Sequence, residues 1–349
     1  MTRSAASRFL LAVLVSGSTL SACGLTPHPE PNTTLTRLAA RAATEAKVFD
    51  SSDAPYSALR RENLAELRKE IQRVCGHKND GTLPASCDDS SLDAAIEKAS
   101  FDFDRNSSPA DAATTAAQEL VSSAGDLPEG SMLLAANQLV ALVSAGAAAP
   151  TTGGAMFDPS VNKLKSSDVK VDADAARDAL SWEYSIVYGL GIATASANGL
   201  LKQAVNDSID AHQNRISILQ TSLAPTGELP KPESAYELKK YQQPVDAQST
   251  ADYIEALRKD TTDYWIATAA AAKTTSWKEL ALAFAAQTAA GAPTPGVPIA
   301  QSKRYQPAKK IVLGANHIDD PCSSFCCRDL HGFFASDAQL YFSFFKRPA

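Results

Sequence analysis

The chain is poor in aromatic residues and carries no excess of positive charge. Aromatic side chains make up only 7% of the sequence, whereas hydrophobic residues of all kinds make up 44% and alanine is very common. Alanine has the highest helix propensity and adds little volume to a core. This composition favours an all-α protein with closely spaced helices, and the chain is long enough for one large or two small domains.

The charge balance argues against two kinds of binding, and the hydropathy argues against a membrane-spanning helix after the N-terminal region. The formal net charge of −6 argues against nucleic acid, whose phosphates require a basic face, and against electrostatic docking on a membrane. After the N-terminal region there is no second apolar run long enough to cross a bilayer. Residues 131–149 are interrupted by Asn137, Gln138 and Gly146, so they predict a buried helix.

The N-terminal residues have the layout of a secretory signal. Arg3 and Arg8 precede an apolar run from Phe9 to Leu20, and Leu-Ser-Ala then stands directly before Cys23. This ending resembles the bacterial lipobox, which implies cleavage before Cys23 and a diacylglyceryl anchor on its thiol, with palmitate as a fatty acyl group of the lipid. The alternative is an ordinary signal peptide with an incidental cysteine. We expect a lipoprotein on the extracytoplasmic face of the cell membrane, held there by lipid.

The other cysteines are expected to lie in an oxidising compartment. Cys75 ends a helical pattern, and Cys87 follows a loop rich in Gly, Asn, Asp and Pro, so a Cys75–Cys87 disulfide is the natural pairing. The last three cysteines lie near two histidines and offer a weak alternative, a site for a soft metal. These residues are Cys322, Cys326, Cys327, His317 and His331.

Composition shifts divide the chain into segments. They are a signal peptide (1–22), a Pro-rich tether (23–32), an N-terminal helical region (33–150), a linker (151–171), a four-helix bundle (172–291) and a Cys/Phe-rich tail (292–349). The tail is either a separately docking element or a segment foreign to the domain.

Apolar periodicity places helices in both helical segments. The expected ranges are 33–49, a helix opened by Pro55, 92–103, 109–123, 131–149, 172–198, 200–223, 249–273 and 276–290. Ser249 and either Thr275 or Ser276 are the expected N-caps of the last two helices. In the second helix, Arg60 and Arg61 are assigned to the solvent-facing side.

Two ionisable residues lie on the apolar stripes of consecutive helices. Glu183 lies between Ala179 and Ile186, and His212 lies between Ile209 and Ile216. Burying both would be costly unless they pair. Three interpretations stay open: a buried polar pair that fixes helix register, a metal or catalytic site, or no contact at all.

The residues around this pair resemble a ferritin-like domain of unknown function from actinobacterial secreted and lipid-anchored proteins. The similarity covers about residues 173–290. It rests on the run Ala179–Gly191, Ala211-His212-x-x-Arg215, Pro230-x-Pro232 with Ala235–Leu238, Asp260–Trp265 and Trp277–Ala290. More weakly, Leu38–Ala42 and Arg61–Glu70 resemble a helix pair that often precedes that domain, with Asn63 where a His is expected.

The resemblance implies an antiparallel four-helix bundle, but its di-iron ligand set is incomplete here. A working site needs Glu on two helices and Glu-x-x-His on the other two. Ile209 stands three residues before His212, the third helix offers carboxylates without a His, and the fourth has only Glu279. A mononuclear iron or other divalent metal site at Glu183 and His212 remains the alternative.

No nucleophilic centre is recognisable either. Ser181, Ser185 and Ser208 lie near His212 in helical projection, but nothing indicates an oxyanion hole. We therefore expect an envelope lipoprotein with a structural or interaction role and no catalytic residues. The competing hypotheses are a metal-binding or degenerate di-iron protein and a small-molecule binder. The protein partner is not predicted.

Overall fold

The computed structural model describes residues 29–150, 166–237 and 240–291, and within them the chain is all-α. The predicted fold class is therefore confirmed at this level. The helices are α1 (Thr33–Val48), α2 (Ala54–Cys75), α3 (Asp89–Lys98), α4 (Pro109–Ser122), α5 (Met132–Ser144), α6 (Ser166–Ala193), α7 (Gly199–Leu223), α8 (Ala247–Ala271) and α9 (Thr275–Ala289). The signal peptide, Cys23, most of the tether and the tail lie outside the described residues.

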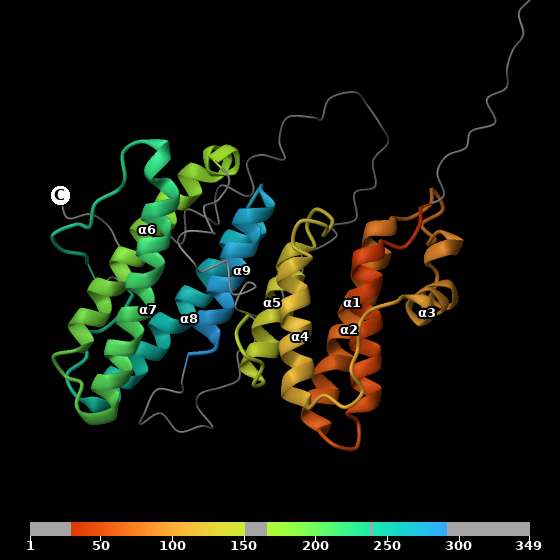
Figure 1. The fold of residues 1–349 in the computed structure, drawn as a ribbon, viewed down its shortest axis with the longest axis horizontal. Helices are drawn as coiled ribbons and strands as arrows, with labels where there is room; N and C mark the ends of the chain where they lie inside the picture. Colours follow the sequence, from red (N-terminus) through yellow and green to blue (C-terminus); the bar gives the residue numbers. More distant parts are fainter. Residues whose placement is uncertain (1–28, 151–165, 238–239, 292–349) are drawn as a thin grey trace, which may run out of the picture.

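Eight of these helices pair into four hairpins that stand in a row (Figure 1). The α6–α7 hairpin packs on the α8–α9 hairpin, whose opposite side contacts α5. The α4–α5 hairpin in turn packs on α1 and α2, and α3 lies against α1 at the end of the row. One continuous hydrophobic core runs through all the hairpins, so the two predicted helical segments share it.

Capping residues explain where several helices begin. Asp246 caps α8 in a capping box, in which Ser249 is the reciprocal N3 residue. Thr274 caps α9 by accepting a hydrogen bond from Trp277 N. The predicted caps Ser249 and Thr275 or Ser276 are thus wrong. Each of them lies inside the first turn of its helix, and the residues with extended backbone are Asp246 and Thr274.

Several predicted boundaries also differ from the structure. The helix α6 begins at Ser166, so the last residues of the predicted 151–171 linker are helical. The helices α3 and α5 are shorter at their C-terminal ends than 92–103 and 131–149. The helices α3 and α8 also begin earlier than predicted, because Asp88 and Asp246 accept hydrogen bonds from the backbone of the first turn.

A close contact between α6 and α8 depends on Gly189. The Tyr253 hydroxyl donates to the Gly189 carbonyl at 3.1 Å, and a Cβ at this position would lie 2.9 Å from that hydroxyl. Gly189 therefore allows these two helices to pack closely. Gly191 has nothing within 4 Å of its notional Cβ, so no close contact depends on it.

Candidate functional site

The predicted pair Glu183 and His212 meets inside the α6–α9 half of the row. Glu183 projects from α6 with none of its surface exposed, and His212 projects from α7 with 6% exposed. Their helices form one hairpin, and the adjacent helix α8 contributes Trp265, which is also fully buried. Helical periodicity alone was therefore sufficient to predict that these two ionisable residues lie in the same interior.

Both carboxylate oxygens of Glu183 contact donors from the protein. His212 Nδ1 lies 2.6 Å from Oε2, and Trp265 Nε1 donates to Oε1 at 2.9 Å. The guanidinium of Arg215, one turn after His212, lies 3.8 Å from Oε1. In the sequence, Arg215 and Trp265 were noticed only as parts of the runs that carry the family resemblance. The signal for Arg215 was its position one turn after His212 on the same helix.

Burial and charge set the protonation of this cluster. Burial by itself would raise the pKa of Glu183, but the facing His212 and Arg215 and the hydrogen bonds lower it below its usual range. Burial lowers the pKa of His212, and Arg215 acts in the same direction against the attraction of Glu183. The arrangement is that of an ionised carboxylate, a neutral imidazole donating Nδ1–H, and Arg215 as the balancing charge.

A cation at the predicted Glu183 and His212 metal site would compete with contacts that the protein already makes. A cation at Glu183 would face the Arg215 guanidinium and would need the two oxygens that Trp265 and His212 contact. Within the described part of the chain, no three His, Cys, Asp or Glu side chains converge on a common point. The predicted soft-metal residues from His317 to His331 lie outside it.

The serines near His212 are engaged with their own helices. Ser181 donates to Arg177 O at 3.1 Å, Ser185 to Trp182 O at 2.6 Å and Ser208 to Ala204 O at 2.8 Å. None of these hydroxyls contacts His212 in the structure. A nucleophile needs a base within hydrogen-bonding reach, so this geometry offers no nucleophile and base pair.

A second buried ionic cluster lies in the α1–α2 hairpin, and the sequence reasoning missed it. Glu45 of α1 is fully buried. It accepts a hydrogen bond from the Tyr56 hydroxyl at 2.6 Å and contacts the guanidiniums of Arg41 at 3.4 Å and Arg60 at 2.8 Å. Arg60 is 3% exposed, so its predicted place on the solvent-facing side is wrong. It also donates to Asn63 at 2.7 Å.

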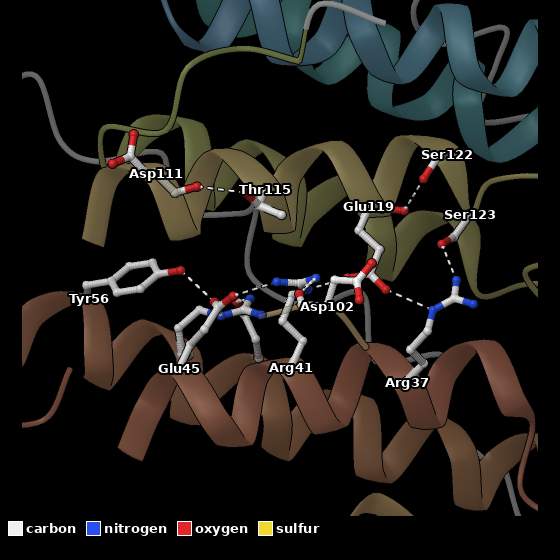
Figure 2. Close-up of polar contacts among 12 residues, drawn as sticks. Arg37, Arg41, Glu45, Tyr56, Asp102, Asp111, Thr115, Glu119, Ser122 and Ser123 are labelled. Carbon is white, nitrogen blue, oxygen red and sulfur yellow. Dashed lines mark hydrogen bonds and ion pairs between the residues drawn. The ribbon is translucent and has the colours of Figure 1, made fainter. Parts of the chain in front are cut away.

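The cluster continues from α1 to α4. Arg37, Arg41 and Glu45 follow each other at four-residue spacing along the face of α1 that looks toward α4 (Figure 2). Glu119 of α4 receives the Nε–H groups of both Arg37 and Arg41. Arg41 makes a third contact by donating to Asp102 O at 2.8 Å, so each nitrogen of its guanidinium has a partner.

An open cleft of about 710 Å³ lies over this part of the cluster. Its lining comes from α1, the segment before α4, and α4 itself. The lining residues are Arg37, Arg41, Ser100, Phe101, Asp102, Thr114, Thr115, Gln118, Glu119 and Ser122. No sequence motif marked the cleft, because its residues are spread over three segments.

The predicted Cys75–Cys87 disulfide is confirmed. The two Cα atoms are 6.5 Å apart, within the roughly 7 Å that a disulfide allows. The bridge closes the loop between α2 and the short 3-10 helix Ala85–Cys87. It fixes the position of α3, which follows directly.

The part of the chain that carries the Glu183 cluster matches a known family model. Residues 175–294 match a family described as a domain of unknown function, DUF4439. No curated protein and no solved structure matches the chain. The match agrees with the expectation of a domain of unknown function at about residues 173–290. Among the described residues, no helix combines the length and apolarity needed to cross a bilayer.

Substituting Glu183 by glutamine should separate a structural role from a metal site. We expect a loss of unfolding free energy on the order of 1–3 kcal/mol, because Arg215 and His212 lose their charged partner while the amide oxygen can still serve Trp265. Metal content should not change between wild type and variant. Chemical denaturation and elemental analysis measure the two. The matched control is Glu255→Gln in the half-buried α8 pair with Arg258.

The same cluster should make the protein less stable in acid. The pKa of His212 is below its ordinary 6.5 in the folded state, so the unfolded chain takes up this proton first as the pH falls. Glu183 adds to the loss at lower pH, since its folded pKa is also lowered. Stability should therefore decline below about pH 6.5 and decline less in His212→Ala. Stoichiometric metal that disappears in His212→Ala would overturn the structural interpretation.

Proposed function

We propose that the protein is a lipid-anchored protein of the cell envelope with a structural or interaction role and without catalysis. The observation that supports this best is the internal use of the Glu183 carboxylate. Its two oxygens contact Trp265 and His212, with Arg215 alongside, so the most buried ionic group of the matched domain joins three helices. Such a cluster specifies which helices pack together and leaves the carboxylate no room for a substrate.

We also propose that α6–α9 form a ferritin-like antiparallel bundle. Two observations support it: α6–α7 and α8–α9 are hairpins, and a long connection between α7 and α8 joins them. A bundle of two hairpins with one long crossover is the connectivity of ferritin-like folds. The di-iron chemistry of such folds is not part of the proposal, since the carboxylate and His pairs it needs are not present on four helices.

The lipid anchor rests on Cys23 and can be tested directly. Cys23→Ala should release the protein from the membrane fraction or leave it as the uncleaved precursor, because the thiol is the proposed site of lipid attachment. Cell fractionation followed by immunoblotting measures both outcomes. Thr26→Ala, three residues further along the tether, is the control and should keep the protein in the membrane. Normal cleavage with unchanged membrane retention of the Cys23 variant would refute the anchor.

A further inference from the structure

The cleft between α1 and α4 has a lining whose charges cancel. Two guanidiniums, of Arg37 and Arg41, face two carboxylates, of Asp102 and Glu119. Arg37 and Arg41 already hold Glu119 between them, and Arg41 also contacts Glu45 beneath the cleft. A ligand with a net charge gains little here, because the lining carries no net charge and both of its guanidiniums are already paired with carboxylates. The lining therefore favours a neutral polar ligand.

Two hydroxyl groups of the lining, those of Thr115 and Ser122, are arranged as acceptors. Thr115 donates its proton to Asp111 O at 2.9 Å, and Ser122 donates its proton to Glu119 O at 3.2 Å (Figure 2). Each hydroxyl oxygen retains lone pairs that a ligand can use, while its only proton is committed to the helix backbone. Thr115 and Ser122 are both exposed, so these oxygens are accessible. A ligand that supplies several O–H donors fits such a wall.

One wall of the cleft is apolar and held in place. Arg41 donates to Asp102 O, and its guanidinium lies 5.0 Å from the centre of the Phe101 ring. Because Arg41 is 5% exposed and anchored by Glu45 and Glu119, it fixes the segment before α4 against α1. The cleft thus offers an aromatic side chain at a defined position beside its hydrogen-bonding groups.

We propose that this cleft binds a short neutral carbohydrate. Sugars combine many O–H donors with apolar C–H faces and carry no charge, which matches the acceptor hydroxyls, the balanced charges and Phe101. The volume of about 710 Å³ lies in the range of roughly 300–1,000 Å³ found for small-molecule sites. Arg37, whose side chain is 39% exposed, supplies N–H donors for the sugar oxygens. This inference goes beyond the proposed function, because it assigns a ligand class to a different region.

The test uses the full-length protein in a detergent without a sugar headgroup. Calorimetric titration with maltose, cellobiose and diacetylchitobiose should show binding of at least one of them. The double variant Thr115→Val/Ser122→Ala removes two acceptor oxygens and keeps the shape, so it should weaken that binding by about tenfold or more. The matched control Ser217→Ala/Thr221→Val changes two exposed residues of the same types on α7 and should bind like wild type.

Three results would overturn the proposal. The first is that none of the three sugars binds, and the second is that the Thr115/Ser122 variant binds as tightly as wild type. The third is tighter binding of glucose 6-phosphate or inorganic phosphate, which would mean that the guanidiniums select an anion. None of these results bears on the lipid anchor, whose test is the membrane fractionation of the Cys23 variant.

Discussion

Replacing Glu45 by glutamine should lower the free energy of unfolding by about 3–5 kcal/mol, the usual cost of removing one partner from a buried ion pair. Glu45 is fully buried, and the guanidiniums of Arg41 and Arg60 both contact it. The substitution keeps the side-chain volume, so the loss reports the stranded positive charges and not a cavity. The Tyr56 hydroxyl would also lose a charged acceptor.

Chemical denaturation followed by circular dichroism measures this loss. The control is Asp174→Asn, which removes an acidic partner of Arg177 at a side chain that is 99% exposed, and which should leave the unfolding midpoint unchanged. A loss for Glu45→Gln below about 1 kcal/mol would contradict the prediction. It would mean that Arg41 and Arg60 recover their electrostatic energy elsewhere, with Glu119 as the nearest carboxylate for Arg41.

Removal of the Cys75–Cys87 bridge should cost about 2–4 kcal/mol of unfolding free energy. The bridge joins cysteines 12 residues apart, and in the chain-entropy account it stabilises by restricting this loop in the unfolded state. We expect Cys75→Ala/Cys87→Ala to unfold at lower denaturant. A reducing agent should lower the stability of wild type by a similar amount.

The double variant supplies its own control, because reductant should have no further effect on it. The prediction fails if wild type unfolds at the same denaturant concentration with and without reductant. In that case the loop would be ordered by its other contacts alone, such as the Lys78 N to Thr82 O hydrogen bond and the packing of the buried Leu92.

The sequence predicted the helices well but located only one of the two ionic clusters. Glu183 and His212 were found because each interrupts an apolar stripe of a long helix. Arg60 lies in the same register as the buried Leu67 and Ile71, yet its charge suggested a solvent-facing position. Its burial depends on Glu45, which belongs to another helix, and a single helical pattern does not contain its partner.

The helix ends and the cleft show the same limit. Pro109 correctly marked the first residue of α4, because proline at the first turn of a helix is a local signal. Asp246 was missed as a cap because Ser249 has similar side-chain chemistry, and only the backbone conformation distinguishes the two. The cleft depends on how α1 and α4 approach each other, which no local pattern encodes.

The position of α5 between two hairpins governs how the chain could be divided. This helix contacts α8 and α9 on one side and α2 and α4 on the other, and most of its residues are buried. A fragment containing only the matched family segment would expose the surface of α8 and α9 that α5 covers. The segment that matches the family model and the unit that excludes water are therefore different lengths of this chain, and fusion or truncation should follow the second.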